Sequence, residues 1–235
     1  MYYFFSTDIL ENKIILSKDE SNHCVKVLRH DIGDTIYVVD GKGMRFTSKI
    51  LNKTNNCVEA EIIETKELTT KSNYYIHIVM APTKSSQRFE WFVEKAVEIG
   101  VDEISFIKTS NSERKKINID RLNKIVLTAM KQSLKASLPK INDIKNFDTV
   151  VSRISQENKF IGYLDDISND FLSNIAPRNS SYCLLIGPEG DFADNEVDIS
   201  IQNGFTPILL GTSRLRTETA ALAGCLMLNQ INYDK

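Results

Sequence analysis

The chain has 235 residues, of which 42% are hydrophobic and 26% charged, and its formal net charge is −2. This composition is ordinary for a folded protein, and the length is sufficient to bury a core without disulfide or metal staples. No apolar run approaches the roughly 20 residues of a membrane helix. The segment Met1–Leu10 lacks the basic start of a signal peptide. We therefore expect a cytoplasmic protein of one or two domains, with no membrane partner.

Cysteine and histidine are too scattered to predict a metal site. The four cysteines lie far apart and never form a Cys-x-x-Cys pair, and the three histidines have no metal-ligand spacing. We expect reduced, mostly buried thiols and no bound metal.

The charge is unevenly distributed along the chain. Residues 84–153 hold 14 basic and 9 acidic side chains, a net of +5, whereas residues 154–235 hold 5 basic and 11 acidic side chains, a net of −6. Phosphate binding depends on a local basic surface, so the first segment is a candidate RNA surface. A solvated face explains such a run equally well, and the charge alone decides nothing.

The first 66 residues predict a small β-barrel with one helix. Asp40-Gly41-Lys42-Gly43 is typical of a hairpin turn, and Ser21–Arg29 carries apolar residues at helical spacing. The polar segment Glu64–Asn73 is the expected linker, which predicts domains at 1–70 and 71–235. The strands expected around the hairpin are Thr35–Val39, Arg45–Ile50 and Cys57–Ile62.

After the linker, strand patterns alternate with helix patterns, which predicts an α/β domain with a largely parallel sheet. The expected strands are Tyr74–Met80, Glu103–Lys108, Phe160–Leu164, Cys183–Gly187 and Pro207–Leu210. The expected helices are Arg88–Ile99, Ile119–Ser137, Asp194–Asn203 and Thr217–Asn229.

Ligands of open α/β sheets bind beyond the carboxyl ends of the strands, and the first unusual strand end is Leu184–Phe192. Gly187 and Gly190 allow close approach of a ligand to the backbone, and Pro188 stiffens the turn between them. A plain strand-to-helix turn and a phosphate cradle are the alternatives. The lysine of a P-loop is missing. Glu189 would repel phosphate but tolerate a cationic sulfonium ligand.

The second unusual strand end is Leu209–Ala221, which turns at Gly211 and enters a helix of small residues. Arg214 and Arg216 are either surface charges or ligand-facing cations. Thr217 is either part of the site or a simple N-cap. The small residues of Ala220–Gly224 favour close packing of this helix against the sheet or against a partner subunit.

Further polar residues could contact RNA phosphates or base edges, although solvated surface positions explain them more simply. These candidates are His23, Arg29, Lys84, Arg88, Lys131, Gln132 and Ser133.

The motifs that carry a family resemblance cover nearly the whole chain. They are His23…Leu28-Arg29, Lys84…Glu90-Trp91, Lys95–Gly100, Gln132-Ser133…Pro139, Gly187–Phe192 and Leu210–Ala220. With these motifs the sequence resembles the RsmE family of small-subunit (16S) ribosomal RNA uridine-N3 methyltransferases, which belong to the SPOUT superfamily. The last two motifs are highly specific, and the earlier ones are supportive.

The resemblance implies an N-terminal PUA-like β-barrel and a C-terminal SPOUT-type α/β domain with a trefoil knot, a feature nearly absent from proteins. It implies a homodimer that acts on 16S rRNA within the small ribosomal subunit and not on DNA. It also implies S-adenosylmethionine as the methyl donor. The implied donor-binding residues are Leu164, Ile186, Gly187, Pro188, Gly190, Leu210, Gly211 and Leu215.

For the chemistry, we expect Arg216 to stabilise negative charge on the uracil oxygens. Glu189 and Glu218 are the candidate general bases. Two positions depart from the family pattern: Asp191 stands where many relatives have a second glycine, and Ala193 where they have serine. Aspartate tolerates a positive φ, so the turn should survive, and Asp191 or Asp194 should replace the lost helix cap.

Three other functions remain open from the residues. A different RNA methylation is the nearest, because the same superfamily also methylates ribose hydroxyls and other bases. An RNA-binding protein without catalysis would use the same basic segment. A nucleotide phosphate-binding protein is disfavoured by Glu189 and by the missing lysine.

Overall fold

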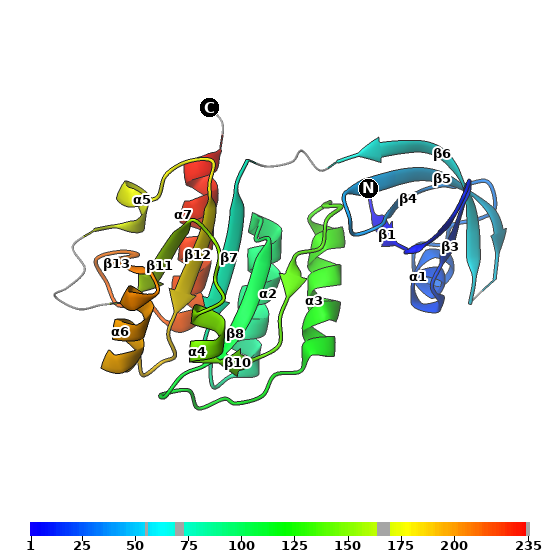
Figure 1. The fold of residues 1–235 in the computed structure, drawn as a ribbon. Helices are drawn as coiled ribbons and strands as arrows, with labels where there is room; N and C mark the ends of the chain where they lie inside the picture. Colours follow the sequence, from blue (N-terminus) through cyan, green and yellow to red (C-terminus); the bar gives the residue numbers. More distant parts are fainter. Residues whose placement is uncertain (55, 69–72, 164–169, 234–235) are drawn as a thin grey trace. The chain divides into compact units, whose positions relative to one another are not determined.

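The structure is a computed structural model that describes residues 1–235 except 55, 69–72, 164–169 and 234–235 (Figure 1). By their internal contacts the residues form two compact units, Met1–Lys71 with Leu127–Leu138, and Ser72–Val126 with Pro139–Lys235. The sequence predicted a single boundary after residue 70, whereas this grouping joins residues 127–138 to the first unit. The domain boundary itself stays a prediction.

The N-terminal unit is built on a six-stranded sheet in the order β1-β4-β5-β6-β3-β2. Strand β1 pairs in parallel with β4, and the other pairs are antiparallel. Side chains alternate along the strands, and one face buries a core that includes Phe4, Ile36 and Val58. The strands are β1 (Tyr3–Phe5), β2 (Asp8–Leu10), β3 (Lys13–Leu16), β4 (Thr35–Val39), β5 (Met44–Lys53) and β6 (Val58–Glu67).

One short helix connects β3 to β4 in this unit. Helix α1 (Lys18–Asn22) begins after Ser17, whose Oγ accepts a hydrogen bond from the Glu20 N–H at 3.3 Å. It continues as a π-helical turn, η1 (His23–Val27). The helix predicted at Ser21–Arg29 is therefore confirmed, although it begins earlier and its second half is a π-turn.

The C-terminal unit is built on a parallel sheet in the order β10-β8-β7-β12-β11-β13, with β9 paired to β8. Its central strand β12 is almost wholly buried, because helices cover both faces. The strands are β7 (Tyr75–Met80), β8 (Glu103–Lys108), β9 (Lys140–Ile141), β10 (Lys145–Asn146), β11 (Asn158–Gly162), β12 (Ser181–Ile186) and β13 (Thr206–Ile208). The five strands that the sequence predicted here are all present.

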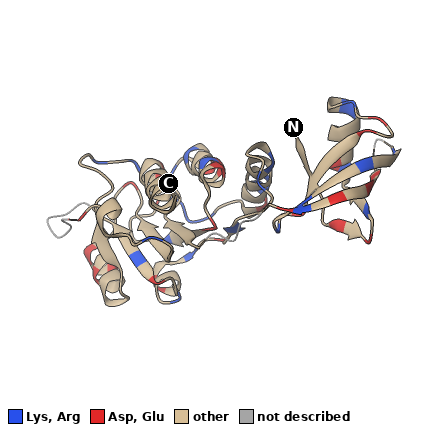
Figure 2. Cartoon of the chain, turned by 90° about the horizontal axis from the view of Figure 1, so that it is seen from above, with Lys and Arg blue, Asp and Glu red and all other residues tan. Residues whose placement is uncertain are grey.

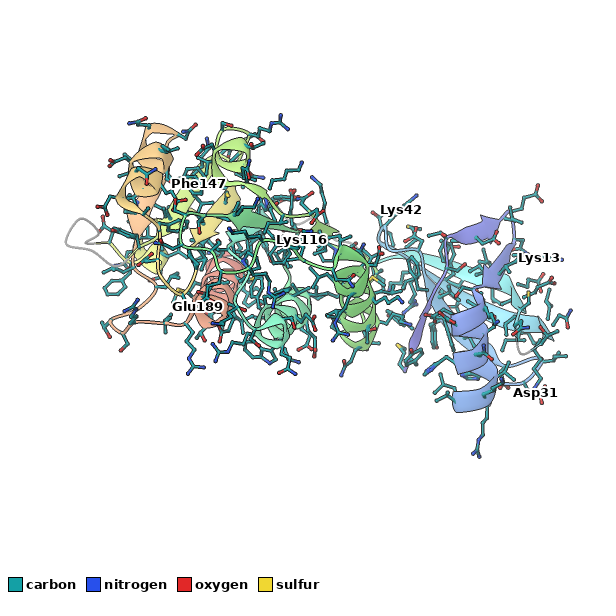
Figure 3. All side chains as sticks on the ribbon, turned by 90° about the horizontal axis from the view of Figure 1, so that it is seen from below. Lys13, Asp31, Lys42, Lys116, Phe147 and Glu189 are labelled. Carbon is teal, nitrogen blue, oxygen red and sulfur yellow. The ribbon has the colours of Figure 1, made fainter. Side chains whose placement is uncertain are left out.

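Helices α2 and α7 cover one face of this sheet, and α4 and α6 cover the other (Figure 3). On the second face Phe147 of α4 packs against Phe192, at a ring-centroid distance of 5.9 Å, within a continuous apolar cluster. The helices of the structure are α2 (Ser86–Ile99), α3 (Ile119–Gln132), α4 (Phe147–Val151), α5 (Leu172–Ile175), α6 (Asp194–Gln202) and α7 (Thr217–Asn232). Within the described ranges, no helix combines the length and hydropathy that crossing a membrane requires.

Helix α7 approaches the sheet closely at Gly224. A Cβ atom at this position would lie 2.1 Å from Cδ2 of Leu184, which is fully buried on β12. Only glycine fits this contact without displacing the leucine. The small residues at the start of α7 therefore serve packing of the helix against the sheet, one of the two roles predicted for them.

Candidate active site

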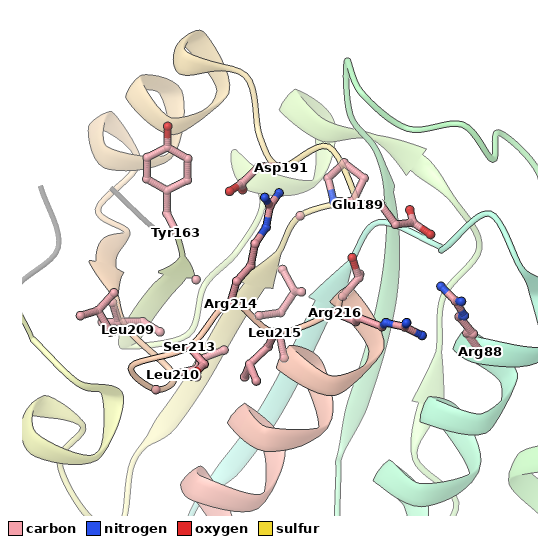
Figure 4. A pocket seen from close by; sticks show the side chains of 18 residues that line it. Arg88, Tyr163, Glu189, Asp191, Leu209, Leu210, Ser213, Arg214, Leu215 and Arg216 are labelled. Atoms are coloured by element: carbon pink, nitrogen blue, oxygen red, sulfur yellow. The ribbon is translucent and has the colours of Figure 1, made fainter. Parts of the chain in front are cut away.

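A cavity of about 400 Å³ opens at the carboxyl ends of β11, β12 and β13, beside the first turn of α7 (Figure 4). This is the edge at which open α/β sheets bind ligands. The cavity is lined by Arg88, Gly162, Tyr163, Ile186, Gly187, Pro188, Glu189, Asp191, Ile208, Leu209, Leu210, Gly211, Ser213, Arg214, Leu215, Arg216, Thr217 and Ala220. The two strand ends that the sequence singled out therefore meet in one pocket.

The loop after β12 is compact because of two residues. A Cβ atom on Gly187 would lie 3.1 Å from the ring of Phe192, so a larger side chain would push against the core. Asp191 takes a φ of 62°, and its Oδ1 accepts a hydrogen bond from the Phe192 N–H at 2.9 Å. The expectation that aspartate tolerates this turn in place of glycine is confirmed.

The cap of α6 differs from the expectation. Neither Asp191 nor Asp194 replaces the missing serine hydroxyl. Instead, Oε2 of Glu196, inside the first turn, accepts a hydrogen bond from the Ala193 N–H at 2.9 Å. The other oxygen of Glu196 accepts from the Ser110 N–H at 2.8 Å. This bond is one half of a capping box and satisfies the N–H of the cap residue, whereas a serine hydroxyl at the cap would accept from an N–H inside the first turn.

Gly211 lines the cavity from the loop after β13, and its missing side chain serves neither packing nor backbone geometry. A Cβ atom there would have no protein atom within 4 Å, and its φ is not in the positive range. A side chain at this position would instead occupy space along the wall of the cavity that Gly211 lines. The position is therefore suited to a ligand that approaches the backbone closely.

Arginine side chains gather at the mouth of the cavity. Arg214 and Arg216 are exposed and form no hydrogen bond or ion pair within the described part of the chain. Arg88 reaches the same pocket from α2. Figure 4 shows Arg88, Arg216 and Glu189 at one end of the pocket and Tyr163 at the other. Two unpaired guanidinium groups beside a cavity are available to a ligand with negative charge.

Hydrogen bonds connect the loops that surround this site. Glu189 Oε1 accepts from the Lys84 N–H at 3.0 Å. Asn111 Nδ2 donates to the carbonyl oxygens of Gly190 and Asp191 at 3.2 and 3.1 Å. Arg114 donates to the carbonyl of Thr83 at 3.0 Å and to that of Lys84. The loops after β7, β8 and β12 are therefore held together at one edge of the sheet.

Asp191 is the lining residue whose acidity is perturbed. Burial raises the pKa of its carboxyl group, while the Phe192 N–H and the positive charge of Arg214 oppose the shift. The carboxyl group is thus easier to protonate than an exposed aspartate. Together with Glu189 it places negative charge beside the arginines, so the pocket has mixed polarity.

Glu218 lies against a lining residue and is nearly buried, with 7% of its surface exposed. Its Oε1 is 3.7 Å from Nε of Arg88. Its Oε2 has no hydrogen-bond partner in the described structure.

Most of the predicted pocket residues come together. Glu189, Arg88 and the expected catalytic Arg216 line the cavity. The predicted donor residues that also line it are Ile186, Gly187, Pro188, Leu210, Gly211 and Leu215. Gly190 does not line it, because its carbonyl faces Asn111 instead. Leu164 lies outside the described residues.

The remaining RNA candidates are distributed over other surfaces. Lys84 lines a second groove with residues 113–116, and its Nζ pairs with Glu113 at 2.8 Å. In the N-terminal unit, Nζ of Lys131 is bonded to Glu20 and lies 5.6 Å from the ring centroid of Tyr2. Figure 2 shows basic and acidic residues interspersed on both units.

Four other candidates in the N-terminal unit differ in their exposure. His23 stacks on Tyr2 at 4.8 Å between ring centroids. The hydroxyl of Ser133 donates to the Ala129 carbonyl of its own helix at 2.7 Å. Arg29, at a φ of 59°, and Gln132 are exposed. Their role in RNA binding stays a prediction.

The sequence did not single out several lining residues, among them Gly162, Tyr163 and Ile208. The signal was available, because strands that end at the same edge must contribute their last residues to the pocket. We placed the end of β11 at residue 164, whereas the strand ends at Gly162.

Cysteines and metal ligands add nothing to this site. None of the four cysteines, all of which the structure describes, forms a disulfide, and the predicted burial holds for Cys24, Cys183 and Cys225. Burial raises the pKa of the Cys24 thiol to about 11, which keeps it protonated. Among the residues that the structure describes, no cluster of three His, Cys, Asp or Glu side chains is arranged to hold a metal.

Two family models and a relative from Buchnera aphidicola match this chain. Residues 70–229 match the family described as RNA methyltransferase domain, and residues 16–63 match the RNA methyltransferase PUA domain. The ribosomal RNA small subunit methyltransferase E of Buchnera aphidicola subsp. Schizaphis graminum is 29% identical over 94% of this chain and 92% of its own length.

Two solved structures are similar over nearly the whole chain. A protein from Porphyromonas gingivalis, described as a probable rRNA-methyltransferase, is 37% identical with a TM-score of 0.92, over 99% of this chain and 98% of that one. The ribosomal RNA small subunit methyltransferase E from Neisseria gonorrhoeae, solved bound to S-adenosyl methionine, is 25% identical. Its TM-score is 0.89, over 99% of this chain and 98% of that one.

Proposed function

This chain belongs to the RNA methyltransferase domain family, and on that premise we propose that it transfers a methyl group from S-adenosylmethionine to N3 of one uridine in 16S ribosomal RNA. The observation that carries the proposal is the single pocket formed by Gly187–Asp191 and Leu210–Arg216, the two most specific motifs of the resemblance. The predicted PUA-like unit and the α/β methyltransferase unit are confirmed.

The residues of the pocket fit this methyl donor. The apolar side chains of Ile186, Leu210 and Leu215 suit an adenine ring, and Gly211 leaves space for it along the wall. Arg214, which has no partner in the described structure, suits the carboxylate of the donor's amino-acid portion. Glu189 places a negative charge where a cationic sulfonium is tolerated.

The donor supplies an activated methyl group, so the tasks of the protein are orientation and exclusion of water. Holding two reactants in line can contribute about 7–11 kcal/mol toward the barrier. We assign Arg216 to stabilise the negative charge that grows on the uracil oxygens. The ring nitrogen carries a proton that must leave as the new bond forms, which requires an acceptor; Glu189 lines the pocket and remains a candidate.

The wider context of the reaction is also proposed. We infer a cytoplasmic homodimer with a trefoil knot that acts on the small ribosomal subunit. Exposed apolar side chains on two neighbouring helices, Trp91 of α2 and Leu226 of α7, support an association surface. For RNA binding we retain the candidates named from the sequence, which are His23, Arg29, Lys84, Arg88, Lys131, Gln132 and Ser133.

The decisive experiment maps ribosomal RNA by mass spectrometry in a strain that lacks this gene. We expect the loss of one N3-methyluridine, restored by the intact gene and not by an Arg216→Ala variant. A complete set of N3-methyluridines in the deletion strain would refute the function. Titration calorimetry with S-adenosylmethionine separates the enzyme from a pure RNA-binding protein, which should bind no donor.

A further inference from the structure

The carboxylate of Glu218 is exceptional among the acidic groups of the site. The residue is 7% exposed, yet Oε2 has no hydrogen-bond partner within the described ranges. A buried acceptor that lacks a donor costs free energy, and native proteins retain few of them. Such an atom needs an explanation, and a ligand donor that arrives during function provides one.

The position of Glu218 connects it to the pocket. It is the second residue of α7, and its neighbours Thr217 and Ala220 in the same first turn line the cavity, whereas Glu218 itself is not among the lining residues. Its other oxygen, Oε1, is 3.7 Å from Nε of Arg88, which lines the same cavity from α2. The Arg88 guanidinium thus lies beside the carboxylate that carries the unsatisfied oxygen, and that carboxylate is two residues after Arg216 in sequence.

Resting on the proposed function, we propose that Arg88 and Glu218 recognise the target uracil, and that Glu218 accepts its N3 proton. In RNA, uracil has a single ring N–H, at N3, flanked by the carbonyl oxygens O2 and O4. Oε2 of Glu218 is the acceptor for N3–H, and the Arg88 guanidinium donates to an adjacent carbonyl oxygen. Cytosine presents an unprotonated N3 at the same place, so two acceptors would meet and binding would be disfavoured.

The transfer balances with the groups named. The N3–H bond breaks and its proton goes to Oε2 of Glu218, while the N3 electron pair forms the bond to the methyl carbon. The bond between that carbon and the donor sulfur breaks, and its electron pair stays on sulfur as a neutral thioether. Glu218 then releases the proton to solvent. No metal, oxidant or reductant takes part.

Glu218 fits this role better than Glu189. Glu189 is exposed, and its Oε1 already accepts the Lys84 N–H at 3.0 Å. A carboxylate shielded from water interacts more strongly with a substrate N–H, because less solvent screens the contact. The two residues therefore divide the work: Glu189 holds a loop, and Glu218 contacts the base.

The test compares Glu218→Gln with the wild type, using small ribosomal subunits purified from a strain lacking the gene. The glutamine preserves shape but accepts no proton at neutral pH. We expect single-turnover methylation to fall by about 10²–10⁴-fold, with S-adenosylmethionine affinity unchanged in calorimetry. We also expect the variant's rate to rise about tenfold per pH unit above neutrality, because only ionised uracil then reacts, whereas the wild-type rate rises less steeply.

A second readout does not depend on turnover. RNA fragments carrying uridine or cytidine at the mapped position are bound by each variant and their affinities compared. The wild type should prefer uridine, and both Glu218→Gln and Arg88→Met should lose that preference. The Arg88 variant keeps the buried carboxylate in place, so the proposal remains testable if the Glu218 variant does not fold.

The matched control is Glu103→Gln, which changes a carboxylate of similar burial at the opposite edge of the sheet. We expect it to alter stability but neither the rate nor the base preference. If the methylation rate of Glu218→Gln is within threefold of the wild-type rate, with the same pH profile, this proposal is overturned and the proposed function is not. A wild type that leaves uridine unmethylated overturns the proposed function as well.

Discussion

The Lys84 N–H donates a hydrogen bond to Oε1 of Glu189 at 3.0 Å, across 105 positions of sequence. This bond connects the loop after β7, which begins the basic segment, to the loop after β12, which forms the wall of the pocket. The geometry of the surface around Lys84 and that of the pocket are therefore linked through one exposed side chain.

Replacing Glu189 by alanine should weaken this link. We expect the KM for ribosomal RNA to rise several-fold, because the Lys84 loop loses its hydrogen bond to the pocket wall and keeps only those to Arg114. The melting temperature should change little, because the side chain is exposed. Steady-state kinetics with small subunits and a thermal melt measure both. A normal KM combined with a large loss of turnover would instead place Glu189 in the chemistry.

Arg216→Ala should lower turnover by about 10²–10³-fold, because it removes a cation beside the developing negative charge. Its guanidinium has no partner in the described chain, so folding stability should not suffer. Single-turnover assays measure the rate, and calorimetry measures donor affinity. The comparison variant is Arg214→Ala, for which we expect weaker donor binding. Near-normal turnover in Arg216→Ala would remove that residue from the mechanism.

Gly211→Val should lower the affinity for S-adenosylmethionine at least tenfold without reducing stability. The reason is that no protein atom lies within 4 Å of a Cβ atom at this position, while the residue lines the cavity. Calorimetry and a melt of the ligand-free protein test the two parts. Thr212→Val, at the exposed neighbouring position outside the lining, serves as the control. Equal losses in both variants would contradict this assignment.

His77 should make stability depend on pH below neutrality. Burial lowers the pKa of its imidazole, although the nearby Glu103 carboxylate opposes the shift, and its Nε2 lies 2.7 Å from the Ser105 hydroxyl. The folded state thus binds a proton less readily than the unfolded chain. The free energy of unfolding should therefore fall as pH drops below the unfolded value of about 6.5, by at most about 1.4 kcal/mol per pH unit.

Urea unfolding at pH 7.5 and 5.5 measures this effect. The lowered pKa of Glu103 matters only at more acidic pH, so this carboxyl group does not contribute to the difference. In His77→Asn the difference between the two pH values should shrink, even though that variant is less stable throughout. An undiminished difference would assign the dependence to other groups.

Local sequence patterns predicted much of the fold. Thr35–Val39 and Glu103–Lys108 match β4 and β8 to the residue, because alternating or continuous apolar runs are bounded there by turn residues. Gly187 and Gly211 predicted the position of the pocket, because a glycine at the end of a strand allows a ligand to approach the backbone closely. The trefoil knot lies beyond such patterns, and only the family resemblance suggested it.

Contacts between distant segments were not predictable in this way. Nothing in the local sequence around Lys131 indicates that its ammonium group bonds to Glu20, 111 positions away. The missing partner of Glu218 Oε2 is likewise a property of the packed α2 and α7 helices. The pattern named Glu218 as a candidate base, but only the three-dimensional arrangement distinguishes it from Glu189.

The strand order determines when the pocket forms during folding. β12 lies between β7 and β11, so the wall of the cavity is complete only after segments about 100 positions apart have paired. Such non-local pairing is slow, and partly folded chains therefore lack the donor site. Because the donor binds only the folded protein, its cellular concentration adds to stability by mass action. The folded protein should accordingly resist proteolysis for longer in cells rich in S-adenosylmethionine than in starved ones.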